Sequence, residues 1–361
     1  MKKIKRVYIV CLMICAAISS FGQDTYFSQF QNVPIYYNPA YTGLYTGVRA
    51  RFAFLDQWPA LPYDFKAYHF CADIGERNLP GSGGIGLTLN TDNEGLAFIK
   101  NFNLGINISA RIQFSENVIG QVGFKAAWLQ KKVNWDDFVF SDALDERYGN
   151  IYDSKFKPPD QNVINMADFG VGGVVQFASE TGSLSGNIGF AADHLFEPDQ
   201  SFLKTAKAPL YRKYVANVDL IYAMGSSSGF NSVEDDALKL NPGIIYQSQG
   251  GLNAIQAGMN LTKYGVYLGL WYKTAFGTYA NNSLVMLAGY RYVFADNIGV
   301  RFTYSYDMQL SGALSGTGGA HEITLVVDLN TGGLLGKSGG GSTGRMLRRQ
   351  GYDSRLECSE F

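Results

Sequence analysis

The chain has 361 residues and a net charge of −1, which gives no electrostatic reason to expect nucleic-acid binding. Charged residues are 17%, against about a quarter in ordinary soluble domains, while aromatic residues reach 14% and glycine 42 residues. Two of the four cysteines lie within the first 22 residues, so too few remain for a disulfide framework.

The first residues have the three parts of a secretory signal peptide. An apolar stretch, 7–18, is shorter than the roughly 20 apolar residues that a helix needs to span a bilayer. Ser20 and Gly22 are the small residues expected at −3 and −1 for cleavage before Gln23. We therefore interpret 1–22 as a cleaved signal peptide, whose basic start is formed by Lys2, Lys3, Lys5 and Arg6.

Segment 23–46 precedes the first predicted strand. It is rich in aromatic residues and contains an Asn-Pro turn signal at Asn38-Pro39. We expect it to fold into or against the periplasmic mouth of the structure that follows, as a plug or a periplasmic segment.

The stretch 103–114 alternates strictly between apolar and polar residues. Its apolar face runs from Leu104 to Phe114, and its polar face includes Arg111 and Gln113. About ten residues suffice for a tilted strand to cross a membrane. Similar stretches recur along the chain and predict about fourteen strands, at 47–57, 63–75, 83–92, 101–114, 118–130, 167–178, 184–193, 212–224, 238–248, 251–262, 264–274, 282–293, 297–307 and 318–328.

The lengths of the connections alternate as well. Short turns such as 115–117 and 262–263 fall at one parity, and the two longest connections, 131–166 and 194–211, fall at the other. Transmembrane barrels have short periplasmic turns and longer external loops, so this parity predicts an all-β, closed antiparallel transmembrane barrel over 47–328. The connection 225–237 is the exception, being long at periplasmic parity.

A soluble β-sandwich is the competing fold, because its strands alternate in the same way. The signal peptide, the excess of aromatic residues typical of interfacial girdles, and the loop parity favour the membrane barrel. In the barrel, Arg111 and Gln113 face the lumen near the turn at Ser115. Fourteen strands enclose a lumen too wide for side chains to fill, so the lumen is either plugged or conducting.

Three residues on one face of the second strand have side chains that ligate metals: His69, Cys71 and Asp73. They are weak candidates, since side chains that simply line a polar lumen are the favoured interpretation. A glycine-rich match at 81–86 leads into a strand rather than a helix, so it does not predict a nucleotide site. The sequence predicts no cofactor and no catalytic activity.

The longest connection, 131–166, mixes aromatic with acidic residues. Long loops without regular structure are often functional, and aromatic residues are enriched in protein interfaces. A self-packed lid over the lumen is the alternative interpretation. The candidate partner-binding residues are Trp135, Asp136, Asp137, Phe138, Phe140, Tyr148 and Tyr152.

The end of the chain, 329–361, is a separate element. Residues 331–346 are rich in Gly and Ser and predict a flexible linker, and Arg348, Arg349 and Arg355 follow. An even number of strands returns the chain to the periplasm, so we expect a basic periplasmic tail.

Several short motifs resemble the PorP/SprF family of Bacteroidetes outer-membrane proteins. The most specific is Asn38-Pro39-Ala40-Tyr41-Thr42-Gly43, which follows Phe27-Ser28-Gln29-Phe30. The resemblance runs from about 23 to 328 and extends to Gln57-Trp58, to 84–87 and to His321-Glu322-Ile323.

This resemblance implies a role with the type IX secretion system, whose cargo includes gliding adhesins. It implies an outer-membrane protein, surrounded by lipid, that binds or anchors the C-terminal domain of a secreted surface protein and contacts secretion components. Asn38, Pro39, Tyr41 and Gly43 would belong to the periplasmic segment. A passive solute channel or a transporter of hydrophobic compounds is the alternative.

Overall fold

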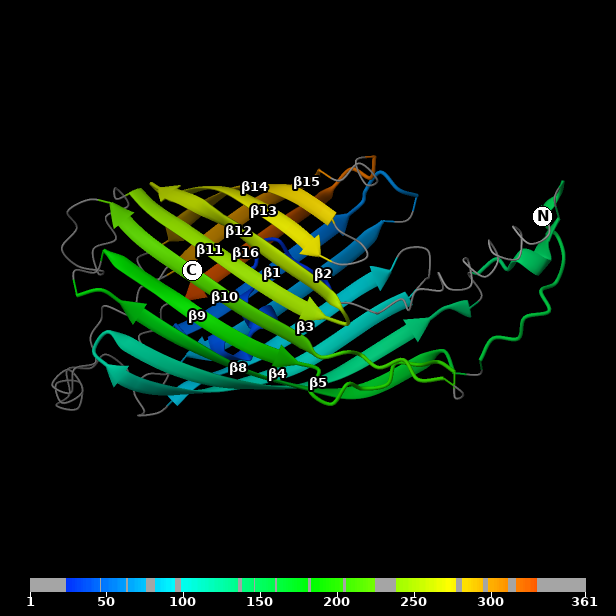
Figure 1. Ribbon diagram of the computed structural model, residues 1–361, viewed down its shortest axis with the longest axis horizontal. Coiled ribbons are helices and arrows are strands. Elements are labelled where there is room, and N and C mark those ends of the chain that lie inside the picture. The colour runs from blue at the N-terminus through cyan, green and yellow to red at the C-terminus, as the bar shows by residue number, and fades with distance from the viewer. Residues whose placement is uncertain are drawn as a thin grey trace, which may run out of the picture.

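Fourteen antiparallel strands form a closed barrel in the computed structural model (Figure 1). Neighbouring strands pair in chain order, and the first strand closes the ring by pairing with the last. A closed sheet pairs the backbone N–H and C=O groups for which lipid offers no hydrogen-bond partner. The closed barrel confirms the predicted fold. The structure describes residues 24–45, 47–62, 64–75, 82–94, 99–135, 138–145, 147–159, 161–180, 183–203, 206–224, 238–276, 281–294, 298–310 and 316–329.

The strands lie where the alternating stretches predicted them, with ends that differ by a few residues. The largest difference is at the sixth predicted strand, 167–178, which begins four residues earlier than predicted. The barrel strands are β1 (Gly47–Gln57), β2 (Phe65–Gly75), β3 (Ser82–Glu94), β4 (Ile99–Ser115), β5 (Val118–Val133), β8 (Val163–Ala178), β9 (Leu184–Asp193), β10 (Lys213–Met224), β11 (Leu238–Gln249), β12 (Leu252–Lys263), β13 (Val266–Phe276), β14 (Asn281–Phe294), β15 (Ile298–Gln309) and β16 (Ala320–Leu329).

The remaining elements are short. Inside the barrel lie the helix α2 (Pro34–Tyr37) and the 3₁₀ turn η1 (Pro39–Tyr41). The long loop between β5 and β8 holds the 3₁₀ turn η4 (Ser141–Ala143) and a small hairpin of β6 (Leu144–Asp145) and β7 (Gly149–Asn150). No helix in the described ranges is long and apolar enough to cross a membrane.

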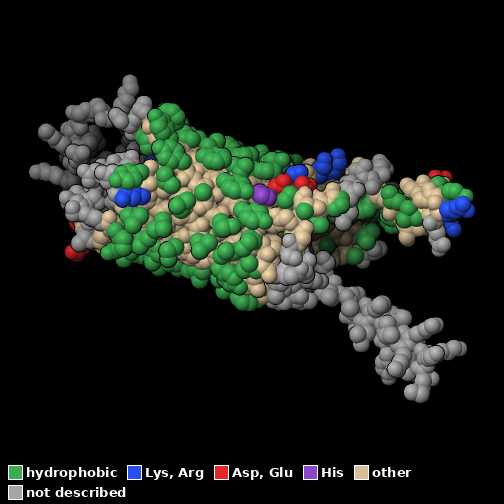
Figure 2. Space-filling view, turned by 90° about the horizontal axis from the view of Figure 1, so that it is seen from above, with side chains coloured by type: hydrophobic (Ala, Val, Ile, Leu, Met, Phe, Trp, Pro, Cys, Tyr) green, Lys and Arg blue, Asp and Glu red, His purple; other side chains and the backbone are tan. Residues whose placement is uncertain are grey.

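Apolar side chains cover the outer wall of the barrel (Figure 2). On β4, Ile106 and Ile112 are 58% and 55% exposed, whereas Asn107 between them is fully buried. Arg111 lies on the lumen side as predicted, paired in register with the buried Gln121 of β5. An outer apolar face is the opposite of what a soluble sandwich presents, because a sandwich turns its apolar faces toward each other.

The two ends of the barrel differ. The connections 134–162 and 194–212 leave the same end, which we call the loop end (Figure 1). The connections between β4 and β5 and between β12 and β13 lie at the other end, the turn end, and are two residues long. By the rule that external loops are the long ones, the loop end faces the cell exterior. The exceptional connection 225–237 lies outside the described residues.

Residues 24–45, which we call the plug, lie inside the barrel rather than beneath it. Asp24 contacts Lys213 at the start of β10, at the loop end. Gly43 contacts Asp73 near the last residues of β2, at the turn end. The plug therefore runs through the lumen from the loop end to the turn end, and only its last residues reach the mouth at which the whole segment was expected. The predicted signal peptide, 1–22, lies outside the described residues, as does all of the predicted tail, 329–361, except its first residue.

An arginine on the outer face of β4 tests whether this face contacts lipid. Ile108 lies in the middle of the apolar row and is half exposed. We expect Ile108→Arg to lower the free energy of unfolding by about 2–4 kcal/mol, because a charge at the bilayer midplane is costly. Urea unfolding in lipid vesicles measures this, with Lys100→Arg, above the apolar row, as the control. Equal stability of both variants would contradict the membrane assignment.

Candidate functional site

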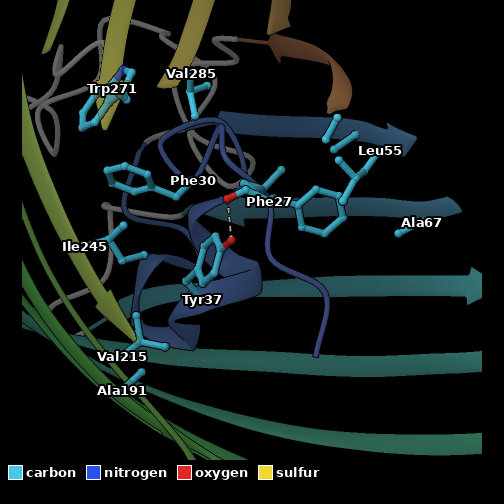
Figure 3. Close-up of a cluster of buried hydrophobic side chains, with 13 residues drawn as sticks. Phe27, Phe30, Tyr37, Leu55, Ala67, Ala191, Val215, Ile245, Trp271 and Val285 are labelled. Carbon is cyan, nitrogen blue, oxygen red and sulfur yellow. Dashed lines mark hydrogen bonds between the residues drawn. The ribbon is translucent and has the colours of Figure 1, made fainter. Parts of the chain in front are cut away.

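Aromatic side chains of the plug fill the middle of the lumen (Figure 3). Phe27 and Phe30 are almost completely buried, and Phe30 meets Trp271 of β13 edge to face, with ring centroids 5.3 Å apart. The Tyr37 hydroxyl donates a 2.7 Å hydrogen bond to the carbonyl of Phe27. This bond links the end of α2 to the beginning of the plug. Small and aliphatic lumen residues complete this cluster, among them Ala191, Val215, Ile245 and Val285.

The carboxylate of Glu322 on β16 holds the start of the plug. It accepts the backbone N–H of Ser28 at 2.7 Å and that of Gln29 at 3.2 Å. The Ser28 hydroxyl contacts the Asp307 carboxylate, and the Lys273 ammonium lies 3.1 Å from the same hydroxyl. Lys273 and Asp307 form an ion pair at 3.4 Å. All of these groups are buried or half-buried, so the contacts compete little with water.

Gln29 adds contacts along the same strands. Its side-chain amide donates to the Ser305 hydroxyl and to the carbonyl of Glu322, at 3.1 and 3.0 Å. Its side-chain oxygen accepts from Asn32 and from Thr324. The Ser28-Gln29 and His321-Glu322 motifs are each visible in the sequence, but their contact was not predicted. A glutamate on the lumen row of the last strand was a signal that could have indicated it.

Asn38 fixes the bend in the middle of the plug. Its side-chain oxygen accepts the backbone N–H of Ala40 at 2.8 Å and so caps η1, which begins at Pro39. Its amide nitrogen donates to the carbonyls of Gly173 on β8 and Phe190 on β9, at 3.0 and 3.3 Å. One side chain thus closes the turn and attaches it to the wall.

Tyr41 and Thr42 bind other parts of the wall. The Tyr41 hydroxyl accepts a 2.6 Å hydrogen bond from Asn217 of β10. The Thr42 carbonyl accepts from the Ser109 hydroxyl at 2.7 Å and from the Gln121 amide at 2.6 Å. These bonds reach β4, β5 and β10, the strands that flank β8 and β9 in the barrel.

Gly43 packs against the wall where a larger residue would not fit. Its φ of +62° favours glycine, and a Cβ there would lie 2.4 Å from the Cα of Gly84. Its N–H donates to the Asp73 carboxylate at 2.8 Å, and Asp73 also pairs with Arg51 at 2.8 Å. Among the predicted segment residues, Asn38, Tyr41 and Gly43 therefore attach the plug to the barrel by hydrogen bonds, and the backbone of Pro39 packs against Gly123 of β5.

The three weak metal candidates line the lumen but bind different neighbours. Asp73 is held by Arg51 and Gly43, and the Cys71 sulfur lies 3.8 Å from an Arg51 nitrogen. His69 Nδ1 lies 2.5 Å from the Asn90 side-chain oxygen. Arg51 supplies the positive charge beside Asp73, so the arrangement favours the structural interpretation over a metal site.

A cluster of charges surrounds Asp24 at the loop end. Its carboxylate lies 3.0 Å from both His194 Nε2 and the Lys213 ammonium. His194 Nδ1 lies 3.0 Å from Asp168, and Lys125 pairs with Asp168 at 3.5 Å and contacts Asp193. In the described residues, Asp168, Asp193 and His194 bring their donor atoms within 4.8 Å of one another. Lys125 pairs with both carboxylates and His194 with Asp168, so the acidic groups already have cationic partners, which argues against a metal ion there.

These contacts fix the charges of Asp24 and His194, which both lie outside the strands. Burial raises the pKa of Asp24, but Lys213 and His194 outweigh it and hold that pKa well below its usual value. Burial lowers the pKa of His194, and the neighbouring carboxylates, Asp24 first, reverse this and raise it to about 10. His194 is therefore positively charged at neutral pH.

In the part of the chain that the structure describes, the cavities beside the plug are small. A cavity of about 100 Å³ lies at the loop end, lined among others by Asp24, Tyr36 and Lys213. Smaller cavities of about 30 and 20 Å³ lie around Phe30 and Gln31.

The two long loops pack on each other through aromatic rings. The ring centroid of Trp135 lies 5.5 Å from that of Phe138 and 6.2 Å from that of Phe156. It lies 6.1 Å from the ring centroid of Phe202, which belongs to the other loop. Phe140 meets Phe156 at 4.5 Å. The predicted partner-binding residues Trp135, Phe138 and Phe140 are thus brought together, whereas Asp136 and Asp137 lie outside the described residues.

Tyr148 and Tyr152 lie apart from this ring cluster, near the hairpin of β6 and β7. They are 67% and 55% exposed. The Asp145 carboxylate accepts the N–H of Tyr148 at 2.9 Å and the hydroxyl of Tyr152 at 3.1 Å. The loop is therefore ordered by its own hydrogen bonds and still presents aromatic surface to the outside.

Removing the Glu322 side chain tests the attachment of the plug. We expect Glu322→Ala to lower the free energy of unfolding by roughly 1–3 kcal/mol for each buried N–H left unsatisfied. A loosened plug should also raise ion conductance in planar bilayers. Glu322→Gln keeps an acceptor and should lose less, and His321→Ala, on the neighbouring outer face, is the control. A Glu322→Ala variant with unchanged ion conductance and an unchanged free energy of unfolding would contradict the attachment.

Titration of His194 by NMR tests the charge cluster. We expect a pKa near 10 in the folded protein. Because this exceeds the unfolded value of about 6.5, the stabilisation is fully present below pH 6.5 and is lost as the pH rises through 10. Asp24→Asn should move the pKa down, since the nearest carboxylate is removed. A His194 signal that titrates near 6.5 in the unaltered protein would rule out the ion pair.

Comparisons with known proteins place the chain. The family model described as type IX secretion system membrane protein PorP/SprF matches residues 19–327. No curated protein matches at a significant level. Solved barrels resemble it more distantly: the CymD monoaromatic hydrocarbon channel at 10% identity and TM-score 0.42, covering 82% of this chain and 91% of that one, and a Pseudomonas aeruginosa FadL homologue at 11% and 0.41, covering 78% and 89%. The family match spans most of the chain, which therefore belongs to the PorP/SprF family of type IX secretion system membrane proteins.

Proposed function

We propose that this protein is an outer-membrane docking barrel, which holds a secreted surface protein at its external loops instead of passing it through the lumen. The observation that carries the proposal is the plug. Phe27, Phe30 and Tyr37 fill the lumen, and hydrogen bonds attach the plug to β16 at one side and to β8 and β9 at the other. A lumen filled in this way is suited to closing the barrel, not to conducting a polypeptide.

The long loops supply the docking surface in this proposal. Contact between Trp135 and Phe202 joins them into one unit at the loop end. The unit presents Tyr148, Tyr152 and Phe156, each at least 45% exposed. Aromatic side chains that are ordered and exposed are typical of protein interfaces, because they contribute contact area at a small cost in entropy.

Family membership supplies the class of partner. A type IX secretion system membrane protein acts where exported proteins reach the cell surface, which fits loops that face outward. The proposed partner is therefore a secreted surface protein of adhesin type, bound through its C-terminal domain. Periplasmic secretion components would meet the opposite, turn end.

A solute channel is the second candidate, and the cavity of about 100 Å³ at the loop end favours it. Its lining combines the ring of Tyr36 with the charges of Asp24 and Lys213. Planar-bilayer recordings separate the two functions: a steady open pore in the unaltered protein favours transport, and a silent barrel favours docking.

Deleting residues 135–156 tests the docking proposal. The deletion removes the aromatic cluster and the small hairpin but leaves the pairing of β5 with β8 intact. We expect surface retention of the secreted protein to fall at least tenfold, while the barrel still folds. Cell-surface labelling of the secreted protein measures retention, and heat-dependent mobility in gels measures folding.

A milder pair of variants controls for the size of the deletion. Tyr148→Ser with Tyr152→Ser should weaken retention, whereas Tyr264→Ser should not. Tyr264 is equally exposed but lies at the turn end. Full retention by the deletion variant would refute docking through this loop.

A further inference from the structure

The rim of the barrel has a step between β8 and β9. β5 and β8 pair over their full length, up to Lys132 opposite Val163. β9 pairs with β8 only from Val171 onward, because β9 ends at Asp193. Residues 163–170 of β8 therefore have a strand on one side only. Among the described strands, every other neighbouring pair at the loop end is matched to within about three residues.

The direction of the backbone groups on this overhang follows from one hydrogen bond. Val133 donates its N–H to the carbonyl of Asn162 at 3.0 Å, so even-numbered residues of this stretch face β5. Val163, Asn165, Ala167 and Phe169 then face away from β5, toward the missing strand.

Only two of these outward backbone groups have partners in the described part of the chain. The Phe169 carbonyl accepts the N–H of Leu195 at 3.0 Å. The Val163 carbonyl accepts from the Gln161 side chain at 3.0 Å. The N–H and C=O groups of Asn165 and Ala167 are thus left as an open edge, a template for a further strand.

This edge crosses the outer boundary of the lipid, since Ala167 is in register with Trp128 and Asn165 with Gln130. Toward the loop end, the outer apolar rows finish at an aromatic level formed by Phe102 and Trp128, whose rings are 5.8 Å apart. Above that level the outer face is polar: Lys132 is exposed, and Gln130 donates to Asn165 at 3.0 Å. An incoming strand would therefore meet Val163 and Asn165 above the aromatic level, at the external surface, and Ala167 at that level.

A groove leads to the edge. It has a volume of about 630 Å³ and ends at Val163, the first residue of β8. One wall is the end of the longer loop, with Phe156 and Pro159, and the other is the second loop, with Phe202 and Leu203. Phe156 and Leu203 are about half exposed, so the groove offers apolar surface beside an unpaired backbone.

We propose that residues 163–169 of β8 receive an extended segment of the secreted partner as an added strand, whose apolar side chains enter the groove. The inference rests on the proposed docking function and names how the partner is held. Strand addition to an open edge is a general mode of peptide recognition, in which main-chain bonds supply affinity and side-chain pockets supply specificity.

A single segment fits this place better than a second copy of the barrel. The second loop stands beside the overhang, attached at Leu195 to Phe169 and at Phe202 to Trp135. The space between that loop and β8 is bounded on both sides, which suits one chain. Edge-to-edge pairing of two barrels would require the loop to move away.

Hydrogen exchange of the isolated protein, resolved to single amides, tests whether the edge is open. We expect the amides of Asn165 and Ala167 to exchange at least a hundredfold faster than those of Ile164 and Met166, which face β5. Protection of all four amides in the isolated protein would overturn the proposal.

Proline substitutions test the occupant, with the purified C-terminal domain of a surface protein exported by the type IX system of the same cell as the probe. Ala167→Pro removes one outward N–H and leaves the β5 ladder intact, since proline is tolerated on edge strands. We expect its affinity for the probe to fall at least tenfold, with Asn165→Pro as the second variant. Ala167→Ser and Asn165→Ala keep the N–H groups and should bind within twofold of the unaltered protein.

The outcomes separate the two proposals. If the unaltered protein does not bind the probe, the docking function and this inference both fail. If both proline variants bind normally while deletion of 135–156 abolishes binding, docking stands and strand addition is wrong. A concentration-dependent dimer that the proline variants abolish would make a second copy the occupant and would overturn the assignment.

Discussion

The hydrogen bonds between the plug and the barrel wall are the contacts on which the rest of the structure depends. Fourteen strands enclose a lumen that their own side chains cannot fill. The Glu322 carboxylate closes one side by accepting from Ser28 and Gln29, and Asn38 closes the other by donating to β8 and β9. With both sides fixed, Phe27 and Phe30 are held in the middle as the apolar core.

This arrangement explains why the lumen is polar and yet tightly packed. The outer face of each strand must be apolar to meet lipid, so packing inside has to be made largely with the polar residues of the inner face. Buried groups such as Arg51, Asp73 and Glu322 would be costly in isolation, and the plug supplies partners for the two carboxylates. The plug therefore supplies hydrogen-bond partners to the wall as well as blocking the lumen.

The barrel was largely predictable from sequence because its information is local. Alternation along 103–114 placed Ile106 toward lipid and Arg111 toward the lumen, and loop parity gave the two ends. The path of the plug was not predictable in this way. Contacts such as Ser28 with Glu322 join residues almost 300 positions apart, and no period within either segment signals them. The start of the plug at the loop end, beside His194, followed only from the structure.

The open edge at β8 results from the unequal lengths of neighbouring strands. A closed barrel has no free edge where its strands are of matched length, so an edge arises only where one strand outgrows its neighbour. β8 continues past the end of β9 because β5 continues with it, and both end in the loop that holds Trp135. Extending this pair above the lipid lifts the aromatic cluster away from the membrane and exposes Asn165 and Ala167 beneath it. The same extension thus creates both parts of the proposed docking surface, the aromatic unit and the open strand.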